Sequence, residues 1–263
     1  MTDQIMTDWI TTARITVAVS GALGRMGREV VAAIGAEPDL LLAAELDKDD
    51  DLADALANVK PVALVDFSVP EAVMGNIEAA LAARVVPIVG TTGLSPVDVA
   101  HVRDLCRHHQ CGALIAPNFA IGAVLMMQFA RLAAKHMPDA EIIEMHHEKK
   151  LDAPSGTAAK TAEMIAEGRA AFAPTLLPAD AFEKIAGARG GKGVGDIPIH
   201  SVRLPGFVAS QMVIFGGLGQ TLTLRHDSID RKSFMPGVIL AVRHAPALAV
   251  NGGVLVYGLE NLL

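Results

Sequence analysis

The stretch Ile15-Thr-Val-Ala-Val-Ser-Gly-Ala-Leu-Gly-Arg-Met-Gly27 decides the fold of the first half of the chain. Its opening run to Ser20 is β-rich and predicts a short strand, and the segment 28–35 reads as a helix. Between them lie three glycines in the order G-x-x-G-x-x-G. A glycine-rich turn before a helix collects free backbone N–H groups at the positive end of the helix dipole, where a phosphate binds. The stretch therefore indicates a dinucleotide-binding turn, with tight packing as the plainer alternative.

The turn departs from the usual G-x-G-x-x-G fingerprint, because Leu23 occupies the place of the second glycine. We expect Gly24 to take over the close approach to a pyrophosphate. The next apolar run, 40–46, ends at Asp47, twenty residues after Gly27, which is the spacing at which an acid reaches the adenosine ribose. The acidic run 47–51 makes an exposed, solvated acid the alternative interpretation of Asp47.

Strand and helix patterns then alternate, which predicts a Rossmann-like, doubly wound parallel sheet with helices on both faces. The expected strands are 61–67, 85–89 and 113–116, and the expected helices are 70–84 and 95–110. Such sheets bind ligands beyond the carboxyl ends of their strands. Here those ends carry the small and polar segments 66–68, 90–93 and 116–119.

Composition narrows the function classes. The chain has 263 residues, a hydrophobic fraction of 51% and a net charge of −7, so we expect a large α/β core and no general attraction to nucleic acid or an anionic membrane. Cys106 and Cys111 form no Cys-x-x-Cys pattern, which argues against a disulfide framework or a metal site and fits the cytoplasm. Residues 1–12 lack the pattern of a secretory signal and read as a loose extension, and no uninterrupted apolar stretch has the length of a membrane span.

A second stretch, 144–160, carries the groups expected to do chemistry. An apolar strand pattern at 140–145 leads into a polar loop, and Ser155 opens a helical pattern to Arg169. His146 supplies an imidazole that exchanges protons near neutral pH, Lys150 a cation, and Ser155-Gly156-Thr157 a helix N-terminus for an anion. Together they suggest a site that binds an acid and protonates it. The alternative is a solvated charged loop followed by an ordinary helix cap.

The second half predicts an α+β domain with an open mixed or antiparallel sheet. The expected elements are a helix at 121–135, antiparallel strands at 197–204, 207–215 and 221–225 that join the strand 141–145, and a final helix at 233–244. The Pro- and Gly-containing stretch 172–195 is interpreted as a loop that closes on the site, with solvated charge at Arg189 and Lys192 as the alternative.

These motifs, in this order and over nearly the whole chain, resemble the 4-hydroxy-tetrahydrodipicolinate reductase family, also called dihydrodipicolinate reductase. The matching blocks are Gly21-Ala-Leu-Gly-Arg-Met-Gly, Val65-Asp-Phe-Ser, Val89-Gly-Thr-Thr-Gly, Ala116-Pro-Asn-Phe-Ala-Ile-Gly and Glu144-Met-His-His-Glu-Lys-Lys-Leu-Asp-Ala-Pro-Ser-Gly-Thr-Ala. The segments 197–205 and 225–228 look like the actinobacterial branch. Glu148 and Lys149 stand at variable places of the motif.

The resemblance implies hydride transfer from NADH or NADPH to a cyclic imine with two carboxylates, in lysine and diaminopimelate biosynthesis. It implies a general acid at His146, a second proton donor or charge stabiliser at Lys150, and substrate contacts at His147, Gly156 and Thr157. It implies a homotetramer and a dinucleotide-binding domain of residues 1–120, completed by 230–263, beside a substrate-binding and oligomerisation domain at 121–229. The dinucleotide contacts that it implies are Gly21, Ala22, Leu23, Gly24, Arg25, Met26, Gly90, Thr91, Thr92, Ala116, Pro117, Asn118 and Phe119.

Two other readings stay open. One is a different nicotinamide oxidoreductase of this architecture, such as an aspartate or homoserine dehydrogenase. Pyridine-2,6-dicarboxylate, which has two carboxylates, should inhibit the enzyme suggested by the resemblance and hardly affect these dehydrogenases. The other is a non-catalytic dinucleotide sensor, which would have no need of a proton donor. For the cofactor itself, Asp47 favours NADH by accepting from the ribose 2′-hydroxyl, whereas Arg25 and Lys48 favour NADPH. We expect both to be used, with NADH at least equal.

Overall fold

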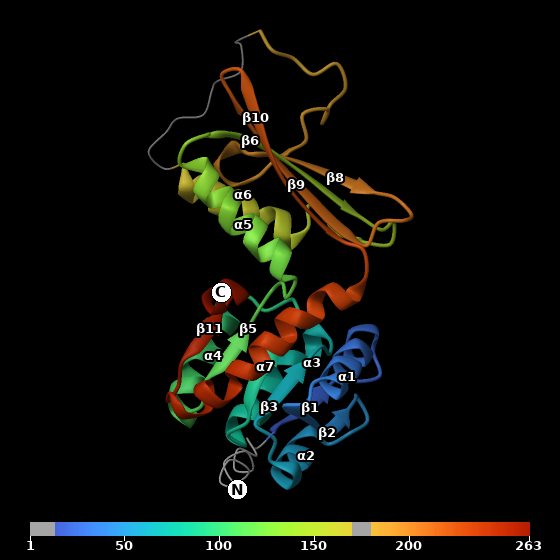
Figure 1. Ribbon diagram of the computed structural model, residues 1–263, viewed down its shortest axis with the longest axis vertical. Helices are drawn as coiled ribbons and strands as arrows, with labels where there is room; N and C mark the ends of the chain where they lie inside the picture. The colour runs from blue at the N-terminus through green and yellow to red at the C-terminus, as the bar shows by residue number, and fades with distance from the viewer. Residues whose placement is uncertain (1–13, 170–179) are drawn as a thin grey trace, which may run out of the picture. The chain divides into compact units, whose positions relative to one another are not determined.

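The computed structural model describes residues 14–169 and 180–263, so the expectation for residues 1–12 lies outside the described part. The chain forms two units. One contains the chain up to Ala116 together with Gly237–Leu262, and the other contains Pro117–Pro236. Each is described by itself below (Figure 1).

The first unit is built on a six-stranded parallel sheet with the strand order β11-β5-β4-β3-β1-β2. Strands β3 and β4 are buried along their whole length, as expected for a parallel sheet covered on both faces. Apolar side chains such as Val65 and Ile88 fill this core. The strands are β1 (Ile15–Ser20), β2 (Leu40–Leu46), β3 (Ala63–Asp66), β4 (Val86–Val89), β5 (Ala113–Ile115) and β11 (Leu255–Tyr257).

The helices of this unit are α1 (Arg25–Ala36), α2 (Leu52–Val59), α3 (Pro70–Ala82), α4 (Pro96–His109) and α7 (Met235–Val250), the last of which belongs to it from Gly237 onward. The chain steps from β1 to β2 in one direction and from β3 to β4 and β5 in the other. Right-handed crossovers therefore place α1 on one face and α3 and α4 on the other. The strand order reverses between β1 and β3, and this switch point is where such sheets bind ligands.

One α-helix and one strand of this unit were not predicted from the sequence. Helix α2 follows the acidic run, and Asp51 caps it by accepting from the backbone N–H of Asp54 at 3.0 Å. Strand β11 has three residues and extends the parallel sheet beside β5. Both are too short for a periodic pattern to stand out from the neighbouring sequence.

The second unit is built on a five-stranded sheet with the order β10-β9-β6-β8-β7. Its strands are β6 (Asp139–His146), β7 (Gly191–Lys192), β8 (Pro198–Arg203), β9 (Ala209–Gly217) and β10 (Gln220–Ser228). β8 and β9 run in opposite directions, as expected, but they are not neighbours, because β6 lies between them and pairs with β8 in parallel and with β9 antiparallel. The long connection from β6 through α6 returns the chain to the starting end of the sheet, which is what a parallel partner requires.

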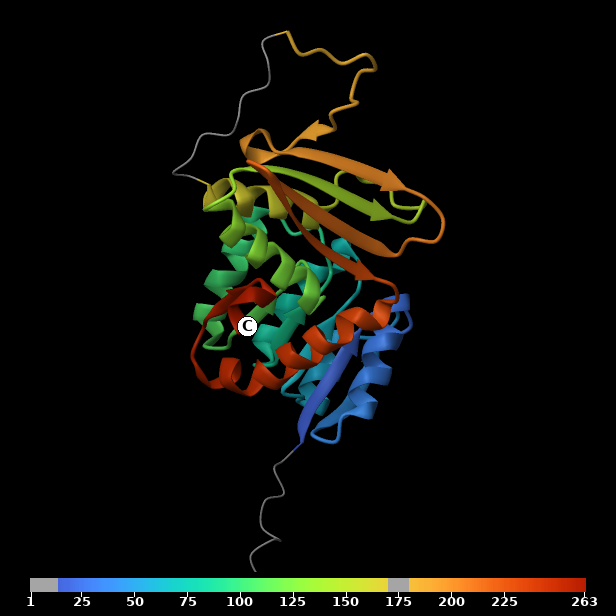
Figure 2. The same ribbon diagram turned by 45° about the horizontal axis from the view of Figure 1, so that its top comes forward.

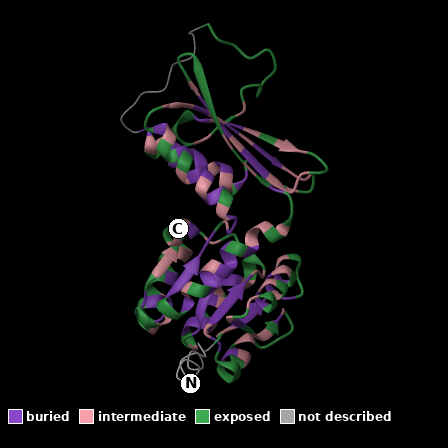
Figure 3. Cartoon of the chain, in the orientation of Figure 1, coloured by how far each residue is buried: buried purple, intermediate pink, exposed green. Residues whose placement is uncertain are grey.

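Helices α5 (Ile121–Ala134) and α6 (Gly156–Gly168) pack on one face of this sheet (Figure 2). The core between them contains Ile142, Val213 and Phe215, which alternation places on the inner face. The residues next to them in sequence, including Ile143 and Ile214, point to the other face and are half-buried. Figure 3 shows buried, intermediate and exposed residues interspersed along the strands of this sheet. No described element of the chain covers that outer face.

One described helical segment, Arg231–Val250, is long and apolar enough to cross a membrane by length and composition. Arg243 interrupts its apolar run and forms ion pairs with Glu37 and Asp39 of the same unit. Its side chains Val238, Val242 and Ala245 are fully buried in the first unit. The segment therefore has the burial pattern of a core helix.

Candidate active site

The register of the second sheet gathers polar side chains on its inner face. Pairing of β6 with β8 and β9, and of β9 with β10, sets four residues side by side across four strands. This row consists of Ser201, Glu144, Gln211 and His226. His146, two residues beyond Glu144 on β6, points to the same face because side chains alternate along a strand.

Glu144 is completely buried and is held by four groups: Arg203, Ser201, His146 and the backbone N–H of Ser155. Arg203 donates to it through Nη1 and Nη2, at 2.9 and 2.8 Å. The backbone N–H of Ser155 donates to Oε1 at 3.3 Å. Burial by itself raises the pKa of Glu144, but the hydrogen bonds from Arg203, Ser201 and His146 outweigh it and hold the pKa below its usual value. The carboxyl group is therefore ionised at neutral pH.

His146 contacts this carboxylate through Nδ1, at 2.5 Å from Oε2 of Glu144. An ionised carboxylate can only accept, so Nδ1 carries a hydrogen and Nε2 is the nitrogen that gains or loses a proton. Burial lowers the pKa of His146, and the opposing effect of Glu144 does not cancel it. Arg203 already neutralises much of the Glu144 charge, which explains why the carboxylate does not raise the pKa further.

An open depression adjoins His146, with about 310 Å³ of empty space when the adjoining open solvent is included. Its wall includes residues from the sheet, from the start of α6 and from the segment before α5. The polar members are His146, Ser155, Thr157, Asn118, Ser210, Gln211, His226 and Ser228. A cavity with convergent polar groups and a titratable imidazole is the expected form of a small-molecule site.

The beginning of α6 contributes the anion-binding part of the cavity. Ser155 is the N-cap and accepts from the backbone N–H of Ala158 at 3.2 Å. Gly156 is exposed, and no atom lies within 4 Å of the place where a side chain would begin, so a ligand can approach its backbone. The Thr157 hydroxyl accepts from Asn118 Nδ2 at 3.1 Å. The structure thus brings Asn118, an expected dinucleotide contact, together with Thr157, an expected substrate contact.

Lys150 and His147 lie on the loop that connects β6 with α6 but do not line the cavity. The Lys150 ammonium is bound to Asp152 at 2.7 and 3.0 Å and is mostly buried. Its charge is close enough to help lower the pKa of His146. Arg203 donates to the backbone carbonyl of Asp152 at 2.7 Å, so the same guanidinium holds both Glu144 and the loop.

In the first unit, the glycine turn has the geometry that a dinucleotide needs. Gly21 has a φ of +74°, which favours glycine, and a side chain there would collide with the backbone of Phe67 at the end of β3. At Gly27 a side chain would collide with Gly21, so Gly27 sets the close approach of α1 to the turn. No side chain caps α1 at Gly24, and its first turn carries no acid. The free N–H groups of Arg25 and Met26 thus fit a pyrophosphate.

Asp47 is fixed beside this turn. Its carboxylate accepts from the backbone N–H of Leu23 at 3.0 Å and from that of Lys48 at 2.9 Å. The N–H groups of Lys48 and Leu23 lower the pKa of Asp47. Leu23 and Lys48 are exposed, and each carboxylate oxygen keeps a lone pair for a ribose hydroxyl.

The other expected dinucleotide contacts divide by exposure. Thr92 and Pro117 are exposed. Ala22, Ala116 and Phe119 are buried, so these three residues can offer a dinucleotide only backbone groups. A side chain at Gly90 would collide with the Phe67 ring. The Thr91 hydroxyl donates to buried Asp66 at 2.5 Å.

Sequence reasoning gave no role to Glu144 or Arg203, and it named Asp66 only as part of the segment 66–68 at the ligand-facing end of a strand. For Glu144 a signal was present, because a residue two places before a histidine on a strand shares its face. Asp66 accepts from Ser68 at 2.8 Å and from Asn76 at 2.6 Å, and in this way it orders the loop ends of β3 and β4. Arg203 gave no local signal, since it lies 59 residues from Glu144.

The loop expected to close on the site is partly described. Residues 172–179 lie outside the described part of the chain. Arg189 donates to Glu141 at 2.8 Å on the outer face of the sheet and does not line the cavity. Lys192 is exposed and lies 3.8 Å from Asp196.

Three features define the class of protein. They are a parallel sheet with an uncapped glycine turn, an acid at the end of β2, and a separate unit with a buried carboxylate–imidazole pair. The protein is a nicotinamide-dependent reductase with an N-terminal Rossmann-like fold and a second α+β unit.

The chain belongs to the dihydrodipicolinate reductase family. Two family models match it, "Dihydrodipicolinate reductase, N-terminus" over residues 15–119 and "Dihydrodipicolinate reductase, C-terminus" over residues 122–263. It is 51% identical to a 4-hydroxy-tetrahydrodipicolinate reductase of Geobacillus kaustophilus, over 95% of this chain and 99% of that one. It is 50% identical to the enzyme of that name from Listeria innocua, over 94% and 99%.

The fold is similar to a solved structure described as dipicolinate-bound dihydrodipicolinate reductase from Paenisporosarcina sp. TG-14. The TM-score is 0.84 at 42% identity, covering 95% of this chain and 100% of the other. A probable dehydrogenase from Thermotoga maritima has a TM-score of 0.61 at 11% identity, which shows a shared fold alone.

Proposed function

We propose that this protein reduces 4-hydroxy-tetrahydrodipicolinate, through its dehydrated cyclic imine, to tetrahydrodipicolinate in lysine and diaminopimelate biosynthesis. The observation that carries the proposal is the pairing of His146 with buried Glu144 beside a cavity that also receives the start of α6. In a member of this family, that arrangement suits an anionic ring that must gain a proton. NADH or NADPH supplies the hydride when bound.

We infer that the first unit holds the dinucleotide and the second the substrate. The domains would be 1–120 completed by 230–263, and 121–229. The N–H groups at the start of α1 support a pyrophosphate between Gly21 and Met26, and the loop ends at Gly90–Thr92 and Ala116–Phe119 support contacts to the rest of the cofactor. Asp47 supports ribose binding, with Lys48 beside it. Both NADH and NADPH would serve, with NADH at least equal.

The substrate is a small dicarboxylate, and the relative solved with dipicolinate supports this class. We place one carboxylate at the N-terminus of α6, where Gly156 and Thr157 offer backbone N–H groups and the Thr157 hydroxyl. His147 and Lys150, on the loop just before this helix, supply further contacts and positive charge.

The protonation step belongs to His146 in this proposal. Addition of a hydride to a conjugated imine leaves an electron pair on the far side of the ring, and that pair takes a proton from His146 Nε2. Glu144 holds the Nδ1 hydrogen and stabilises the imidazolium before transfer. Lys150 acts as the second proton donor or as a charge stabiliser. One hydride and one proton complete the reduction.

A coupled assay tests the function. Pyruvate and aspartate semialdehyde are joined by the upstream synthase, and loss of NADH absorbance is followed with wild type, His146→Gln and Lys150→Ala. We expect wild-type turnover and a fall of about 10²- to 10⁴-fold in kcat for His146→Gln, the usual contribution of a general acid. Full activity in either variant would remove that residue from the mechanism. Wild type that binds NADH without turnover would favour the sensor interpretation.

We also propose a homotetramer that works in the cytoplasm. The outer face of the second sheet carries half-buried Ile143, Met212 and Ile214, and no described element covers it. Such an apolar sheet face is suited to pairing with the same face of another copy. Light scattering after size exclusion tests this, and Ile214→Lys should reduce the mass of the particle if the face is an interface.

A further inference from the structure

Gln211 and His226 lie in the polar row of the second sheet but have no part in the proton transfer proposed above. They are direct cross-strand neighbours, Gln211 on β9 and His226 on β10, and both line the cavity beside His146. Opposed residues on neighbouring strands have Cβ atoms roughly 5 Å apart, so one ligand group can touch both side chains.

The orientation of the Gln211 amide follows from its neighbours. The Thr161 hydroxyl donates to the carbonyl of Thr157 at 2.7 Å, so it can accept from Gln211 Nε2, which lies 2.7 Å away. The amide nitrogen thus faces α6 and Oε1 is the free end. Gln211 is only 4% exposed, and Oε1 is buried without a hydrogen-bond partner among the described residues. A buried acceptor of this kind needs a donor.

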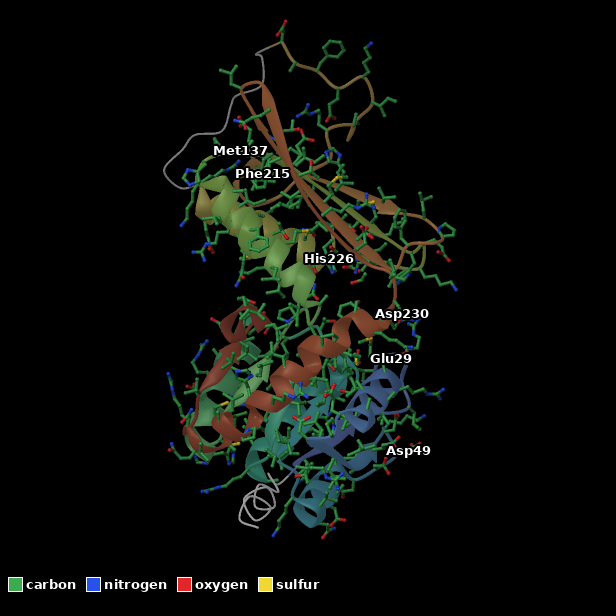
Figure 4. The ribbon with its side chains drawn as sticks, viewed as in Figure 1. Glu29, Asp49, Met137, Phe215, His226 and Asp230 are labelled. Atoms are coloured by element: carbon green, nitrogen blue, oxygen red, sulfur yellow. The ribbon has the colours of Figure 1, made fainter. Side chains whose placement is uncertain are left out.

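His226 is held in place by packing. Figure 4 labels His226 on the second unit, near α5. Its ring lies against Gly122 at the beginning of α5, where a side chain would come within 2.6 Å of Cδ2 and 3.0 Å of Nε2. Burial lowers the pKa of His226 against the opposing effect of Asp227, so the ring is neutral at pH 7. Asp227 is itself paired with Arg225 at 2.8 Å. A neutral ring offers one N–H donor and one acceptor, and within the described chain neither is hydrogen-bonded.

We propose that Gln211 and His226 form a hydroxyl-binding subsite of the cavity. A hydroxyl donates one hydrogen bond and accepts others, so it can give its hydrogen to Gln211 Oε1 and receive the N–H of His226. A carboxylate only accepts and would leave Oε1 unpaired. This inference rests on the proposed function, whose substrate carries a hydroxyl on ring carbon 4, and it names the side chains that recognise this group.

The test compares two ligands that differ by one hydroxyl, cis-4-hydroxypiperidine-2,6-dicarboxylate and cis-piperidine-2,6-dicarboxylate. Their dissociation constants are measured by calorimetry on the full-length protein with NADH present. A hydrogen-bonded hydroxyl should make the first compound about tenfold tighter for wild type. Gln211→Met and His226→Phe should each reduce this preference to less than about threefold while the second compound binds nearly as before.

The variant His226→Gln is the matched control, because it keeps an N–H donor and should keep most of the preference. Thermal melting of each variant checks that it is folded. A preference absent from wild type, or unchanged in both Gln211→Met and His226→Phe, would overturn the subsite. If wild type also fails to bind dipicolinate and to turn over the synthase product, the proposed function itself fails. If both of those succeed, only the subsite is wrong.

Discussion

Arg203 holds Glu144 with two nearly equal hydrogen bonds, 2.9 Å from Nη1 and 2.8 Å from Nη2, at a carboxylate with no solvent exposure. The pair joins β8 to β6 and fixes the side chain that orients His146. Removal of one member of a buried ion pair leaves an uncompensated charge, which makes the pair a sensitive point of the second unit.

Replacement of Arg203 by Met should therefore lower the free energy of unfolding by about 3 to 5 kcal/mol. Urea denaturation measures this loss. Arg189→Met is the matched control, since Arg189 also donates to a glutamate at 2.8 Å but the pair is exposed. That change should cost less than about 1 kcal/mol. Equal losses in the two variants would mean that the Arg203 pair is no more buried in solution than the Arg189 pair.

The Arg203 effect should also depend on pH. The pKa of Glu144 is lower in the folded chain than its ordinary value of 4.5. Its contribution is therefore complete above pH 4.5 and is lost as the pH falls through the folded value. The difference in stability between wild type and Arg203→Met should shrink in that acid range. A difference that stays constant down to the acid unfolding of wild type would contradict an ionised Glu144.

Dipicolinate binding should take up a proton at His146. Burial lowers the pKa of His146 below its ordinary value of 6.5 in the free protein, so the ring is mostly neutral at pH 7. A dianion bound beside it favours the charged ring and raises its pKa. Calorimetry in buffers of different ionisation enthalpy counts the protons. His146→Gln should remove most of the uptake, and uptake that survives this change would have to be assigned to another group, such as His226.

The lowered pKa of His146 also predicts how stability depends on pH. A histidine that gains an acidic partner usually stabilises the fold at low pH, whereas His146 should stabilise it at high pH. Because the folded pKa of His146 is depressed, its contribution is present above pH 6.5 and disappears as the pH falls through the folded value. Glu144→Gln removes the carboxylate that opposes burial, so the pKa should fall further. In kcat/KM against pH, the alkaline limb of the free enzyme should then move to lower pH.

The sequence was sufficient for β1 to β5 of the parallel sheet, because these strands are apolar runs that alternate with helices, but it missed the three-residue strand β11. It predicted a polar loop after the apolar strand, but the strand β6 runs one residue further than expected and contains His146, so the loop begins at His147. It was insufficient for the Glu144–Arg203 pair, which depends on the parallel register of β6 and β8. Nor could it show that the Lys150 ammonium is bound to Asp152, two residues away on the same loop.

Cofactor preference should respond to Asp47. The carboxylate next to the N–H of Leu23 repels the additional phosphate of NADPH and accepts from the ribose of NADH. In wild type, kcat/KM with NADH should be at least equal to that with NADPH. Asp47→Ser should shift the ratio toward NADPH by about tenfold, the value of one charged hydrogen bond. A tenfold advantage of NADPH in wild type would show that Arg25 and Lys48 outweigh the acid.

Two glycines of α1 offer a matched test of the dinucleotide turn. Gly27→Ala places a methyl group against the backbone of Gly21, which cannot move without reshaping the turn. Gly35→Ala, in the last turn of the same helix, meets nothing within 4 Å. We expect Gly35→Ala to stabilise the protein by about 0.5 to 1 kcal/mol, because alanine restricts the unfolded chain. Gly27→Ala should instead lose about 1 to 3 kcal/mol, as other overpacked sites do.

Fluorescence titration with NADH then tests whether the shape of the turn affects cofactor binding independently of the stability of the fold. Gly27→Ala should bind NADH at least tenfold more weakly even where it is fully folded, since the N–H groups that face the pyrophosphate shift with the turn. Unchanged NADH affinity in folded Gly27→Ala would place the pyrophosphate elsewhere.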